Sequence, residues 1–309
     1  MTVVQTKVRH LSDQITDANS IKFLSKFDEL PSSPILNFKL MVVSVDIPFD
    51  EFSSYLPGPA LAPAKIRDAF HSDSSNYFTE SGIDLKTHPK VKEWGALQLP
   101  KGVGAINAIE ESITKILLQH ERILSLGGDH SITYPVIKAF AKKYKDLTIL
   151  HLDAHPDLYD EFEGNRFSHA CPLARIMEGG YAKRLVQVGI RTMNKHQREQ
   201  AKRFGVEVIE MKDWNAQLRF EFEGPVYISL DMDVIDPAFA PGVSHHEPGG
   251  FSTREILSIL QNINANVVGA DLVEFNPTRD TSGITAMLAA KLYKELLDLL
   301  LESDRPALK

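Results

Sequence analysis

The chain has 309 residues, of which 43% are hydrophobic, and this is enough to bury a full core and argues against intrinsic disorder. Its formal net charge of −7 at pH 7 argues against nucleic acid as the main partner, because phosphate binding needs a basic surface. No stretch approaches the roughly 20 apolar residues of a membrane span, so no membrane partner is expected.

Cys171 is the only cysteine of the chain, which excludes an intrachain disulfide framework and fits a reducing compartment. We expect it to be a packed small residue rather than a nucleophile. The stretch MTVVQTKVRHLSDQITDANS at the start of the sequence lacks the basic and apolar segments of a signal peptide. It also carries acidic residues, which are uncommon in organellar transit peptides. These features predict a cytoplasmic location.

Short apolar runs alternate with helical patterns along most of the chain. Runs typical of buried strands lie at 41–48, 123–128, 147–155, 184–190, 206–211, 226–233 and 267–275. Helical patterns lie at 63–70, 106–121, 131–145, 253–264 and 285–303. Near-continuous apolar strands separated by helices predict an α/β fold with a mostly parallel sheet covered on both faces. The polar residues 1–35 are expected to form an N-terminal helical arm, and 36–309 a single catalytic domain.

Polar residues follow four of the predicted strands at the point where each strand ends. ILSL runs into GGDH at 127–130, and TILHL runs into DAHPD at 153–157. VYISL runs into DMDVIDP at 231–237, and ADLV runs into EFNP at 274–277. In open parallel sheets, ligands bind beyond the carboxyl ends of the strands. If these strands are neighbours, their ends meet in one crevice.

Asp231 and Asp233 are two residues apart, and on a strand side chains at this spacing point to the same face. Two carboxylates on one face at the end of an apolar strand are costly without a cation. Asp153 and His155 repeat this spacing after another strand. The combination indicates a metal site rather than separate helix caps or solvated strand ends.

The candidate ligands combine carboxylates and imidazoles without a thiolate, which suits Mn²⁺ better than a structural zinc. Their number exceeds the needs of one tetrahedral site, so two divalent ions about 3.5–4 Å apart are expected if some carboxylates bridge. The same donors would also accept Co²⁺ or Ni²⁺. The candidate metal ligands are His130, Asp153, His155, Asp157, Asp231 and Asp233.

GGDH, DAHPD and SLDMDVIDPAFAPG occur in the order found in the ureohydrolase family of arginases and agmatinases, and the chain resembles this family from about residue 58 to its end. EGNRFSHACPLARIMEGGYAKRLVQVGIR and APGVSHHEPGG are most similar to plant-type arginases and their bacterial relatives. The resemblance implies an arginase/deacetylase-like three-layer fold with a sheet of about eight strands. It also implies a binuclear manganese centre whose bridging hydroxide attacks a guanidinium carbon, so that urea and an amine leave.

The resemblance also assigns roles to individual residues. It places His130 and Asp157 on one metal and His155 and Asp233 on the other, with Asp153 and Asp231 shared between them.

Two further residues match catalytic positions of the family. Glu274 matches the glutamate that pairs with the guanidinium group, and His169 matches the histidine that moves a proton to the leaving amine or from solvent. A carboxylate suits a planar cation, and a histidine titrates in the range needed for proton transfer. Asp129 and Asp236 are expected to orient ligands or cap turns, and His245 and His246 to line the pocket.

The chain departs from animal arginases where the far end of the substrate would bind. The loop LYDEFEGNRFSH lacks their hydroxyl-rich pattern, although Asn165 and Ser168 could contribute, and Asn194 stands where they place acidic residues. The plant-type resemblance favours hydrolysis of L-arginine to L-ornithine and urea. Agmatine, which would give putrescine and urea, and other small guanidino compounds stay open as substrates.

Other interpretations belong to different functional classes. A catalytically silent, metal-stabilised subunit would keep the ligands without turnover, and a deacetylase-like amidohydrolase would use one zinc. The six candidate ligands together with His169 and Glu274 favour the manganese enzyme over both. The resemblance further implies a homo-oligomer, either a trimer or a hexamer.

Overall fold

The computed structural model describes residues 41–302, and the helical arm predicted at 1–35 lies outside the described residues. The extent of the single domain predicted at 36–309 stays a prediction. The strands are β1 (Val42–Ile47), β2 (Val91–Ala96), β3 (Arg122–Gly127), β4 (Thr148–Leu152), β5 (Arg184–Ile190), β6 (Glu207–Glu210), β7 (Pro225–Asp231) and β8 (Asn266–Val273). They form one eight-stranded sheet in the order β2-β1-β3-β8-β7-β4-β5-β6, and every pairing is parallel.

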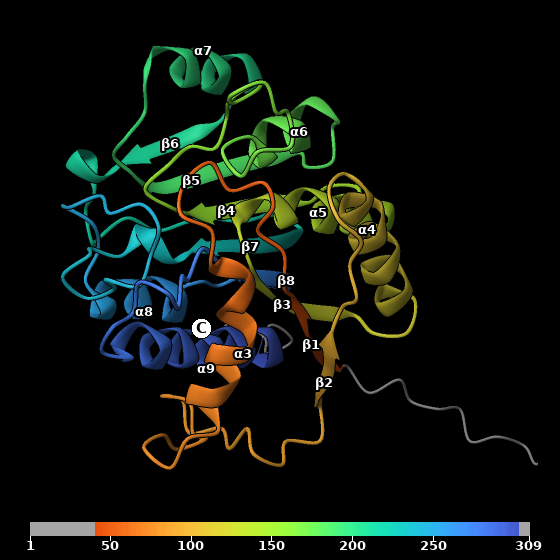
Figure 1. Cartoon of the computed structure of the whole chain (residues 1–309), viewed down its shortest axis with the longest axis vertical. Helices are drawn as coiled ribbons and strands as arrows, with labels where there is room; N and C mark the ends of the chain where they lie inside the picture. Colours follow the sequence, from red (N-terminus) through yellow and green to blue (C-terminus); the bar gives the residue numbers. More distant parts are fainter. Residues whose placement is uncertain (1–40, 303–309) are drawn as a thin grey trace, which may run out of the picture. The chain divides into compact units, whose positions relative to one another are not determined.

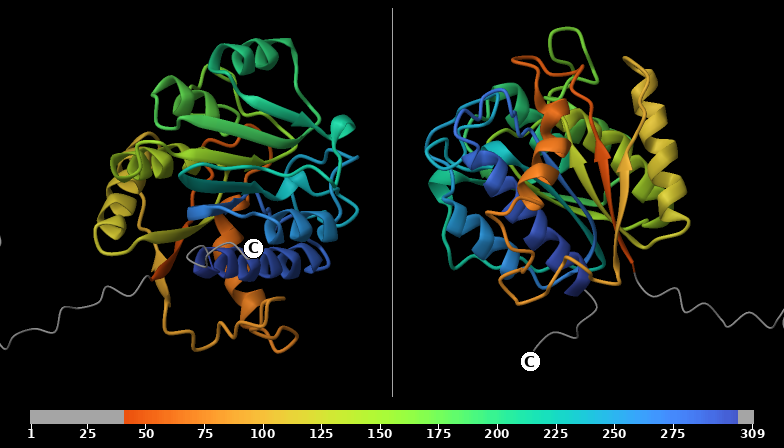
Figure 2. Two further views of the ribbon diagram at one scale, coloured as in Figure 1. Left: turned by 180° about the vertical axis from the view of Figure 1, so that it is seen from behind. Right: turned by 60° about the horizontal axis from the view of Figure 1, so that its bottom comes forward.

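Helices cover both faces of this sheet, as Figure 2 shows in its right-hand view. They are α3 (Ala62–Phe70), α4 (Gly104–Leu117), α5 (Thr133–Lys143), α6 (Pro172–Glu178), α7 (Lys195–Phe204), α8 (Thr253–Gln261) and α9 (Ile284–Glu302). Short 3-10 turns lie at η1 (Pro59–Leu61), η2 (His130–Ile132), η3 (Met211–Asp213) and η4 (Met232–Val234). The predicted three-layer α/β fold is confirmed.

Alternate residues of each strand enter two separate apolar clusters, one on each face of the sheet. Leu124 of β3 packs in the cluster that contains residues of α3, α8 and α9, whereas its neighbour Ile123 packs in the cluster of α4, α5, α6 and α7. Side chains alternate between the faces of a strand, so both faces must be apolar when both are covered. This is why the central strands read as nearly continuous apolar runs.

The sequence patterns did not predict β2, α6 or α7. α6 is short and mostly buried, whereas β2 and α7 are polar. β2 is the edge strand next to β1, and its sequence VKEWGA is mostly exposed. α7 has the sequence KHQREQAKRF and buries only Gln197, Gln200 and Ala201. α7 is nevertheless held at its start by a capping box, in which Asn194 and Gln197 exchange side-chain and backbone hydrogen bonds. The start of α7 is therefore fixed by this cap rather than by the burial of an apolar face.

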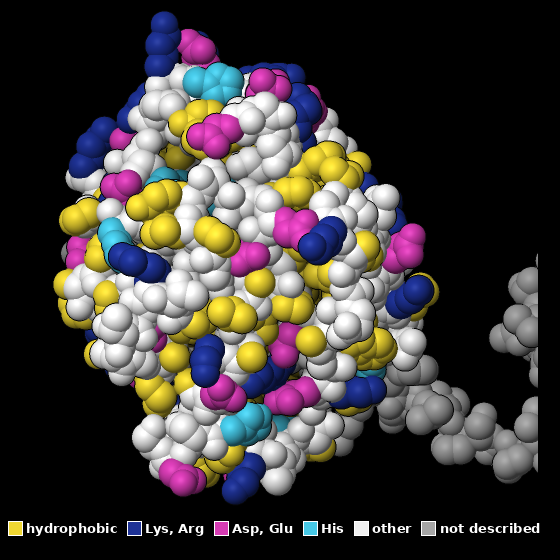
Figure 3. Space-filling model, viewed as in Figure 1, with side chains coloured by type: hydrophobic (Ala, Val, Ile, Leu, Met, Phe, Trp, Pro, Cys, Tyr) yellow, Lys and Arg dark blue, Asp and Glu magenta, His cyan; other side chains and the backbone are white. Residues whose placement is uncertain are grey.

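Charged side chains are dispersed over the face of the molecule seen in Figure 3. Lys and Arg alternate there with Asp and Glu instead of gathering in a single basic patch. Within residues 41–302, no helix is long and apolar enough to cross a membrane.

Candidate functional site

The four strands that end in polar motifs are direct neighbours in the order β3, β8, β7 and β4 (Figure 1). β8 comes last along the chain but inserts between β3 and β7, with Leu126 beside Leu272 and Leu230 beside Leu272 on the other side. All four strands run parallel, so their carboxyl ends lie at one edge of the sheet. The sequence motifs that follow them therefore meet in space.

The turns after β4 and β7, rather than the strands themselves, bring the acidic side chains together. β4 ends at Leu152 and β7 at Asp231, so the same-face argument for a continuing strand does not apply to Asp153 and Asp233. Instead, Asp153 accepts a hydrogen bond from the backbone N–H of His155 at 2.5 Å, and Asp231 accepts one from that of Asp233 at 2.7 Å. Each carboxylate thus folds the chain back on itself, which turns the later side chain toward the same point.

His130 lies at the centre of one half of this cluster. Its Nδ1 atom lies 3.2 Å from Asp153 Oδ2, 3.1 Å from Asp157 Oδ2 and 3.2 Å from Asp231 Oδ2. The imidazole and the Asp153 carboxylate are at most 1% exposed. An octahedral cation with ligands at about 2.1 Å sets neighbouring ligand atoms about 3.0 Å apart, which is close to this spacing.

The hydrogen bonds behind His130 place the lone pair of its neutral form on Nδ1. Ser229 Oγ donates its proton to Asp271 Oδ1 at 2.7 Å, so its contact with His130 Nε2 at 2.9 Å is one in which the imidazole donates. The neutral imidazole then directs the Nδ1 lone pair at three carboxylates. Negative groups repel at that distance unless a positive charge lies among them.

The second half of the cluster is centred on His155. Its Nδ1 atom lies 2.9 Å from Asp233 Oδ2 and 3.5 Å from Asp153 Oδ1. The two oxygens of Asp153 therefore face different histidines, Oδ2 toward His130 and Oδ1 toward His155. The Asp153 carboxylate therefore connects the two halves of the cluster. The His155 half is more open, because the His155 side chain is 24% exposed.

Burial and mutual repulsion make these charges costly in the polypeptide alone. Burial, together with the neighbouring Asp233 and Asp153, raises the pKa of Asp231 well above its ordinary value. His130 Nδ1 and Asp153 Oδ2 are also buried without a hydrogen-bond partner among the described residues. Unsatisfied buried atoms on both sides of one short gap fit a bound cation, and so does the mixed imidazole and carboxylate chemistry.

Two of the site residues adopt left-handed backbone angles, which residues other than glycine rarely do. The φ angle is 50° at Asp157 and 62° at Glu274. Such angles cost about 1–3 kcal/mol each and persist only where the surrounding structure enforces them. At Glu274, the backbone N–H donates to Gly128 O at 2.9 Å, which ties the end of β8 to the turn after β3.

His169 and Glu274 form a buried pair beside this cluster. Glu274 Oε1 lies 2.8 Å from His169 Nδ1 and accepts a hydrogen bond from the backbone N–H of His130 at 2.8 Å. Burial alone would disfavour a charged imidazole, but Glu274 outweighs it and raises the pKa of His169 to about 9. On the other side, Ser54 directs its backbone N–H at His169 Nε2, a contact that favours a lone pair there and opposes the second proton.

Ser54 is one of the site residues that the sequence patterns missed. Its hydroxyl lies 2.8 Å from His169 Nε2. The loop that carries it is held by Asp129, whose Oδ2 accepts from the Phe52 N–H and the Ser53 hydroxyl. Asp129 also caps η2, so its predicted role in shaping turns agrees with its contacts. Ser54 lies in a polar loop far from any motif, and sequence spacing gives no signal for it.

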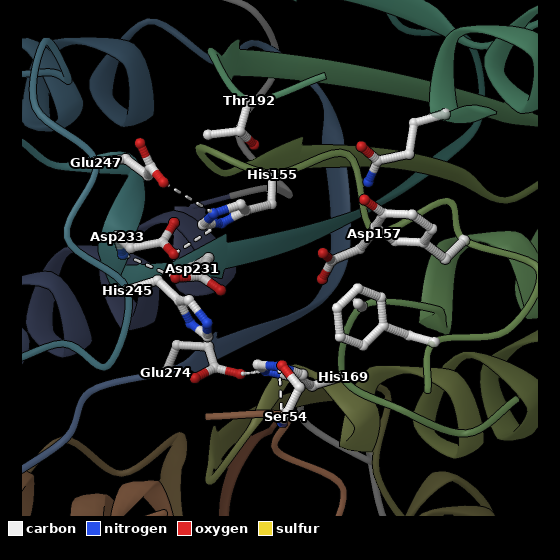
Figure 4. Close-up of a pocket in the computed structure, with 14 residues that line it drawn as sticks. Ser54, His155, Asp157, His169, Thr192, Asp231, Asp233, His245, Glu247 and Glu274 are labelled. Carbon is white, nitrogen blue, oxygen red and sulfur yellow. Dashed lines mark hydrogen bonds and ion pairs between the residues drawn. The ribbon is translucent and has the colours of Figure 1, made fainter. Parts of the chain in front are cut away.

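These residues surround a cavity of about 230 Å³ above the edge of the sheet (Figure 4). In this view, Asp231, Asp233 and His155 lie to the left of it, Asp157 to the right, and Glu274, His169 and Ser54 below. The complete lining is Ser54, His155, Asp157, Tyr159, Phe162, His169, Ala170, Thr192, Gln197, Asp231, Asp233, His245, Glu247 and Glu274. Among the residues that the structure describes, no Lys or Arg lines this cavity.

The three predicted head-group contacts, Asn165, Ser168 and Asn194, are not among the lining residues. Asn165 Oδ1 accepts from the Phe167 N–H inside its own turn, and Ser168 is 3% exposed. Asn194 caps α7 and donates from Nδ2 to the Tyr159 hydroxyl at 2.5 Å. The structure thus turns these polar groups toward local backbone and neighbouring side chains, which their sequence positions could not reveal.

His245 lines the cavity, as expected, between two rings of the site. Its ring centroid lies 5.6 Å from that of His155 and 5.4 Å from that of His169. Burial, with His169 close by, lowers the pKa of His245, so it is a neutral polar group of the cavity. His246 instead points to Pro241 O at 2.8 Å and is exposed. Cys171 is buried, and burial raises the pKa of its thiol to about 12, which fits a packed residue.

Comparison with known proteins gives the chain a clear set of relatives. The model of the arginase family matches residues 41–298. Arginase 1, mitochondrial, of Arabidopsis thaliana is 52% identical over 269 residues, which cover 81% of this chain and 78% of that protein. The agmatinase of Bacillus anthracis is more distant, at 36% identity over 266 residues, which cover 83% of this chain and 90% of that protein.

A solved structure shares the fold as well as the sequence. The arginase from Medicago truncatula superposes with a TM-score of 0.80 at 44% identity, covering 84% of this chain and 87% of that one. At 44% identity, the similarity between the two chains extends beyond the fold to the sequence.

The sequence-based prediction of a cytoplasmic location is wrong, since the arginases of Arabidopsis thaliana and Medicago truncatula, at 52% and 48% identity, are named as mitochondrial proteins. The prediction relied on a lone cysteine and on acidic residues near the start of the sequence. A lone cysteine excludes an intrachain disulfide framework, but it does not distinguish among compartments that keep thiols reduced.

Proposed function

The chain belongs to the arginase family, and from this premise we propose that it hydrolyses L-arginine to L-ornithine and urea. The observation that carries the proposal is the buried cluster of imidazoles and carboxylates around His130 and His155, with Glu274 and His169 beside it in one cavity. The identity to plant arginases favours arginine over agmatine as the substrate.

We propose that this cluster holds two divalent cations, which are Mn²⁺ in the native enzyme, although Co²⁺ or Ni²⁺ would suit the same donors. His130 and Asp157 would bind one cation, and His155 and Asp233 the other. Asp153 would bridge them, because its two oxygens face the two histidines, and Asp231 would be the second shared ligand. When bound, such a pair lowers the pKa of water and supplies a nucleophile at neutral pH.

In this proposal, Glu274 holds the guanidinium group of the substrate. The attraction of His169 outweighs burial and lowers the pKa of Glu274, so the carboxylate is ionised and complements a planar cation. The backbone N–H of His130 and the Nδ1 atom of His169 both bond to the same oxygen of this carboxylate, Oε1. The left-handed backbone of Glu274 directs it into the cavity at the end of β8 rather than along the strand.

His169 supplies the proton that the leaving amine needs. Its Nδ1 atom is engaged with Glu274, so Nε2 is the nitrogen that exchanges protons with the cavity. The Ser54 hydroxyl touches Nε2 and also lines the cavity, and we propose that the proton passes through this hydroxyl. An imidazole and a hydroxyl in contact can hand on a proton without either group having to move far.

The head group of the substrate would meet mostly neutral polar side chains. Thr192, Gln197 and Tyr159 line the cavity, and Glu247 adds a carboxylate whose side chain is 39% exposed. The Thr192 hydroxyl donates to a backbone carbonyl at 3.2 Å, so we propose that Tyr159 and Gln197 bind the α-carboxylate of arginine and that Glu247 faces its α-ammonium group. Asn194 then acts by orienting Tyr159 instead of touching the substrate.

The direct test is urea release by the purified, manganese-loaded protein, with L-arginine and agmatine assayed in parallel. We expect a higher kcat/KM for arginine. A higher value for agmatine would overturn the substrate assignment, and no urea from either would overturn the enzymatic proposal. Glu274→Gln is the matched control, since it should retain its metal while urea release falls.

We also propose that the chain forms a homo-oligomer, as a trimer or hexamer. Light scattering of the eluting peak in size-exclusion chromatography measures the mass directly, and a monomer at micromolar concentration would contradict the proposal.

A further inference from the structure

Two polar residues lie in the sheet directly below the cluster and have no part in the mechanism above. His151 is on β4 and Gln187 is opposite it on β5, and both are 0% exposed. Neither lines the cavity. Polar side chains in the interior of a parallel sheet are costly unless they are hydrogen-bonded. The hydrogen bonds of His151 and Gln187 should therefore show why these polar residues are present.

The contacts of Gln187 fix the orientation of its amide group. The atom that lies 2.6 Å from Pro156 O must be the amide nitrogen, because a backbone carbonyl can only accept. The same nitrogen lies 3.0 Å from His151 Nδ1. The amide therefore donates to Nδ1, which carries a lone pair.

This arrangement decides the tautomer of His151. With the lone pair on Nδ1, the proton is on Nε2, and Nε2 lies 2.8 Å from Asp153 Oδ2. The contact is short, although it lacks the alignment of a regular hydrogen bond. A chain of contacts thus runs from the Pro156 carbonyl through Gln187 and His151 to the carboxylate that faces both His130 and His155.

The orientation of Gln187 also leaves an unmet hydrogen bond. Its Oε1 atom is buried without a hydrogen-bond partner among residues 41–302. A buried polar atom left unpaired costs about 1–3 kcal/mol. An apolar pair of the same shape would avoid that cost, so packing alone does not explain Gln187 and His151.

We propose that Gln187 and His151 are positioning residues for the metal centre. His151 holds the Asp153 carboxylate in the plane that directs one oxygen to each half of the centre. Gln187 sets the His151 tautomer and also fixes the Pro156 carbonyl, immediately before the left-handed Asp157. One glutamine on β5 thereby controls two of the carboxylates. This inference rests on the proposed metal centre and assigns to it two residues that touch neither the substrate nor a cation.

The test measures manganese binding directly, by isothermal titration and by the electron paramagnetic resonance signal of free and bound Mn²⁺. His151→Phe and Gln187→Met should each weaken binding about 10- to 100-fold, which is the usual effect of losing a residue that orients a ligand. His151→Gln should bind within a few-fold of wild type, because its amide nitrogen can take the place of Nε2. Gln200→Met removes a buried glutamine of α7 outside the cavity and should bind like wild type.

Wild-type affinity in both His151→Phe and Gln187→Met would overturn the proposal. So would equal losses in His151→Phe and His151→Gln with a lower Tm of the metal-free proteins, since that pattern belongs to a packing role. If His151→Phe does not fold, the affinity of Gln187→Met decides, because methionine keeps the approximate shape and removes the amide that donates to His151 and to Pro156 O. The readout is separate from catalysis: a wild-type protein that binds two Mn²⁺ but releases no urea would refute the proposed function and leave this inference standing.

Discussion

The floor of the cavity, formed by the turns after β4 and β7, differs from its wall, formed by Tyr159, Thr192, Gln197 and Glu247, in how the side chains are held. Asp231 in the floor and Asp153 directly behind it are at most 2% exposed and are fixed by hydrogen bonds from backbone two residues ahead. The wall comes from loops and from the first turn of α7, and most of its groups are neutral.

This difference separates the residues that carry out the chemistry from those that select the substrate. Buried charges interact strongly, so a change in the floor should abolish chemistry. Neutral groups at a partly exposed wall exchange one hydrogen bond for another with water, so a change there should adjust substrate choice. The predictions below test that division, beginning with the largest expected effect.

Asp153→Ala should have the largest effect, because Asp153 faces both histidines. We expect loss of bound manganese together with a fall in kcat/KM of at least about 10³-fold, equivalent to about 4 kcal/mol of transition-state stabilisation. Metal analysis by mass spectrometry and urea assays on the same sample measure both. Glu161→Gln, at an exposed position of the following loop, is the control for loss of a nearby acid. Retention of two metals per chain would remove Asp153 from the bridging role.

His169→Asn should retain both metals and lower kcat by about 10²–10⁴-fold, the range for loss of a general acid. The pKa of His169 is raised to about 9 by Glu274, against the effect of burial, so its acid form persists to that pH. The wild-type rate should then fall as the pH rises above about 9, and the variant should be flat there. If the variant shows the same fall in rate above about pH 9, that fall belongs to the titration of another group.

The same pair affects stability with a defined sign. The folded pKa of about 9 lies above the value of about 6.5 for an exposed histidine, so the pair stabilises the fold fully below pH 6.5. That contribution is lost as the pH rises through about 9. Unfolding by urea between pH 6 and pH 10 should show a steeper loss in wild type than in His169→Asn.

Glu274→Gln keeps the shape of the side chain and removes its charge. We expect metal content to stay the same and kcat/KM for arginine to fall about 100-fold, equivalent to about 3 kcal/mol for a hydrogen bond to a charged group. Steady-state kinetics with parallel metal analysis measure this. An unchanged kcat/KM would mean that the guanidinium group binds elsewhere.

Tyr159→Phe tests the wall and should have the smallest effect. It removes the hydroxyl that we propose donates to the α-carboxylate, and a hydrogen bond to a charged group is worth about 1.5–3 kcal/mol. Tyr159 is partly exposed, so the low end of this range applies and kcat/KM for arginine should fall about tenfold. Agmatine has no carboxylate, and its kcat/KM should stay the same. The ratio of the two substrates is therefore the measurement, and an equal fall for both would show that Tyr159 does not recognise the carboxylate.

The floor could be predicted because its residues are next to the ends of apolar strands in the sequence. GGDH, DAHPD and DMDVIDP each follow such a run, and parallel strands bring their carboxyl ends to one edge. Even here, the reason for convergence was different from the one expected, since the side chains of Asp153 and Asp231 shape turns instead of continuing the strands.

The wall could not be predicted in the same way. Asn165, Ser168 and Asn194 carry groups suited to the head group of the substrate, but each of them bonds to neighbouring backbone or to Tyr159. Ser54, Thr192 and Glu247 line the cavity from loops that carry no periodic pattern. Short polar side chains satisfy either local backbone or a distant ligand, and only the path of the loop decides between them.

The sequence by itself therefore determined the layered parallel fold, the family and the set of candidate metal ligands, because strand periodicity and strand-end motifs are local properties of the chain. Only the tertiary structure decided that β8 lies between β3 and β7, that Ser54 meets His169, and that Gln187 fixes the tautomer of His151. These relations join residues 36 or more positions apart, and no local pattern encodes them. They follow from the order of strands in the sheet and from which hydrogen bonds the buried side chains can satisfy there.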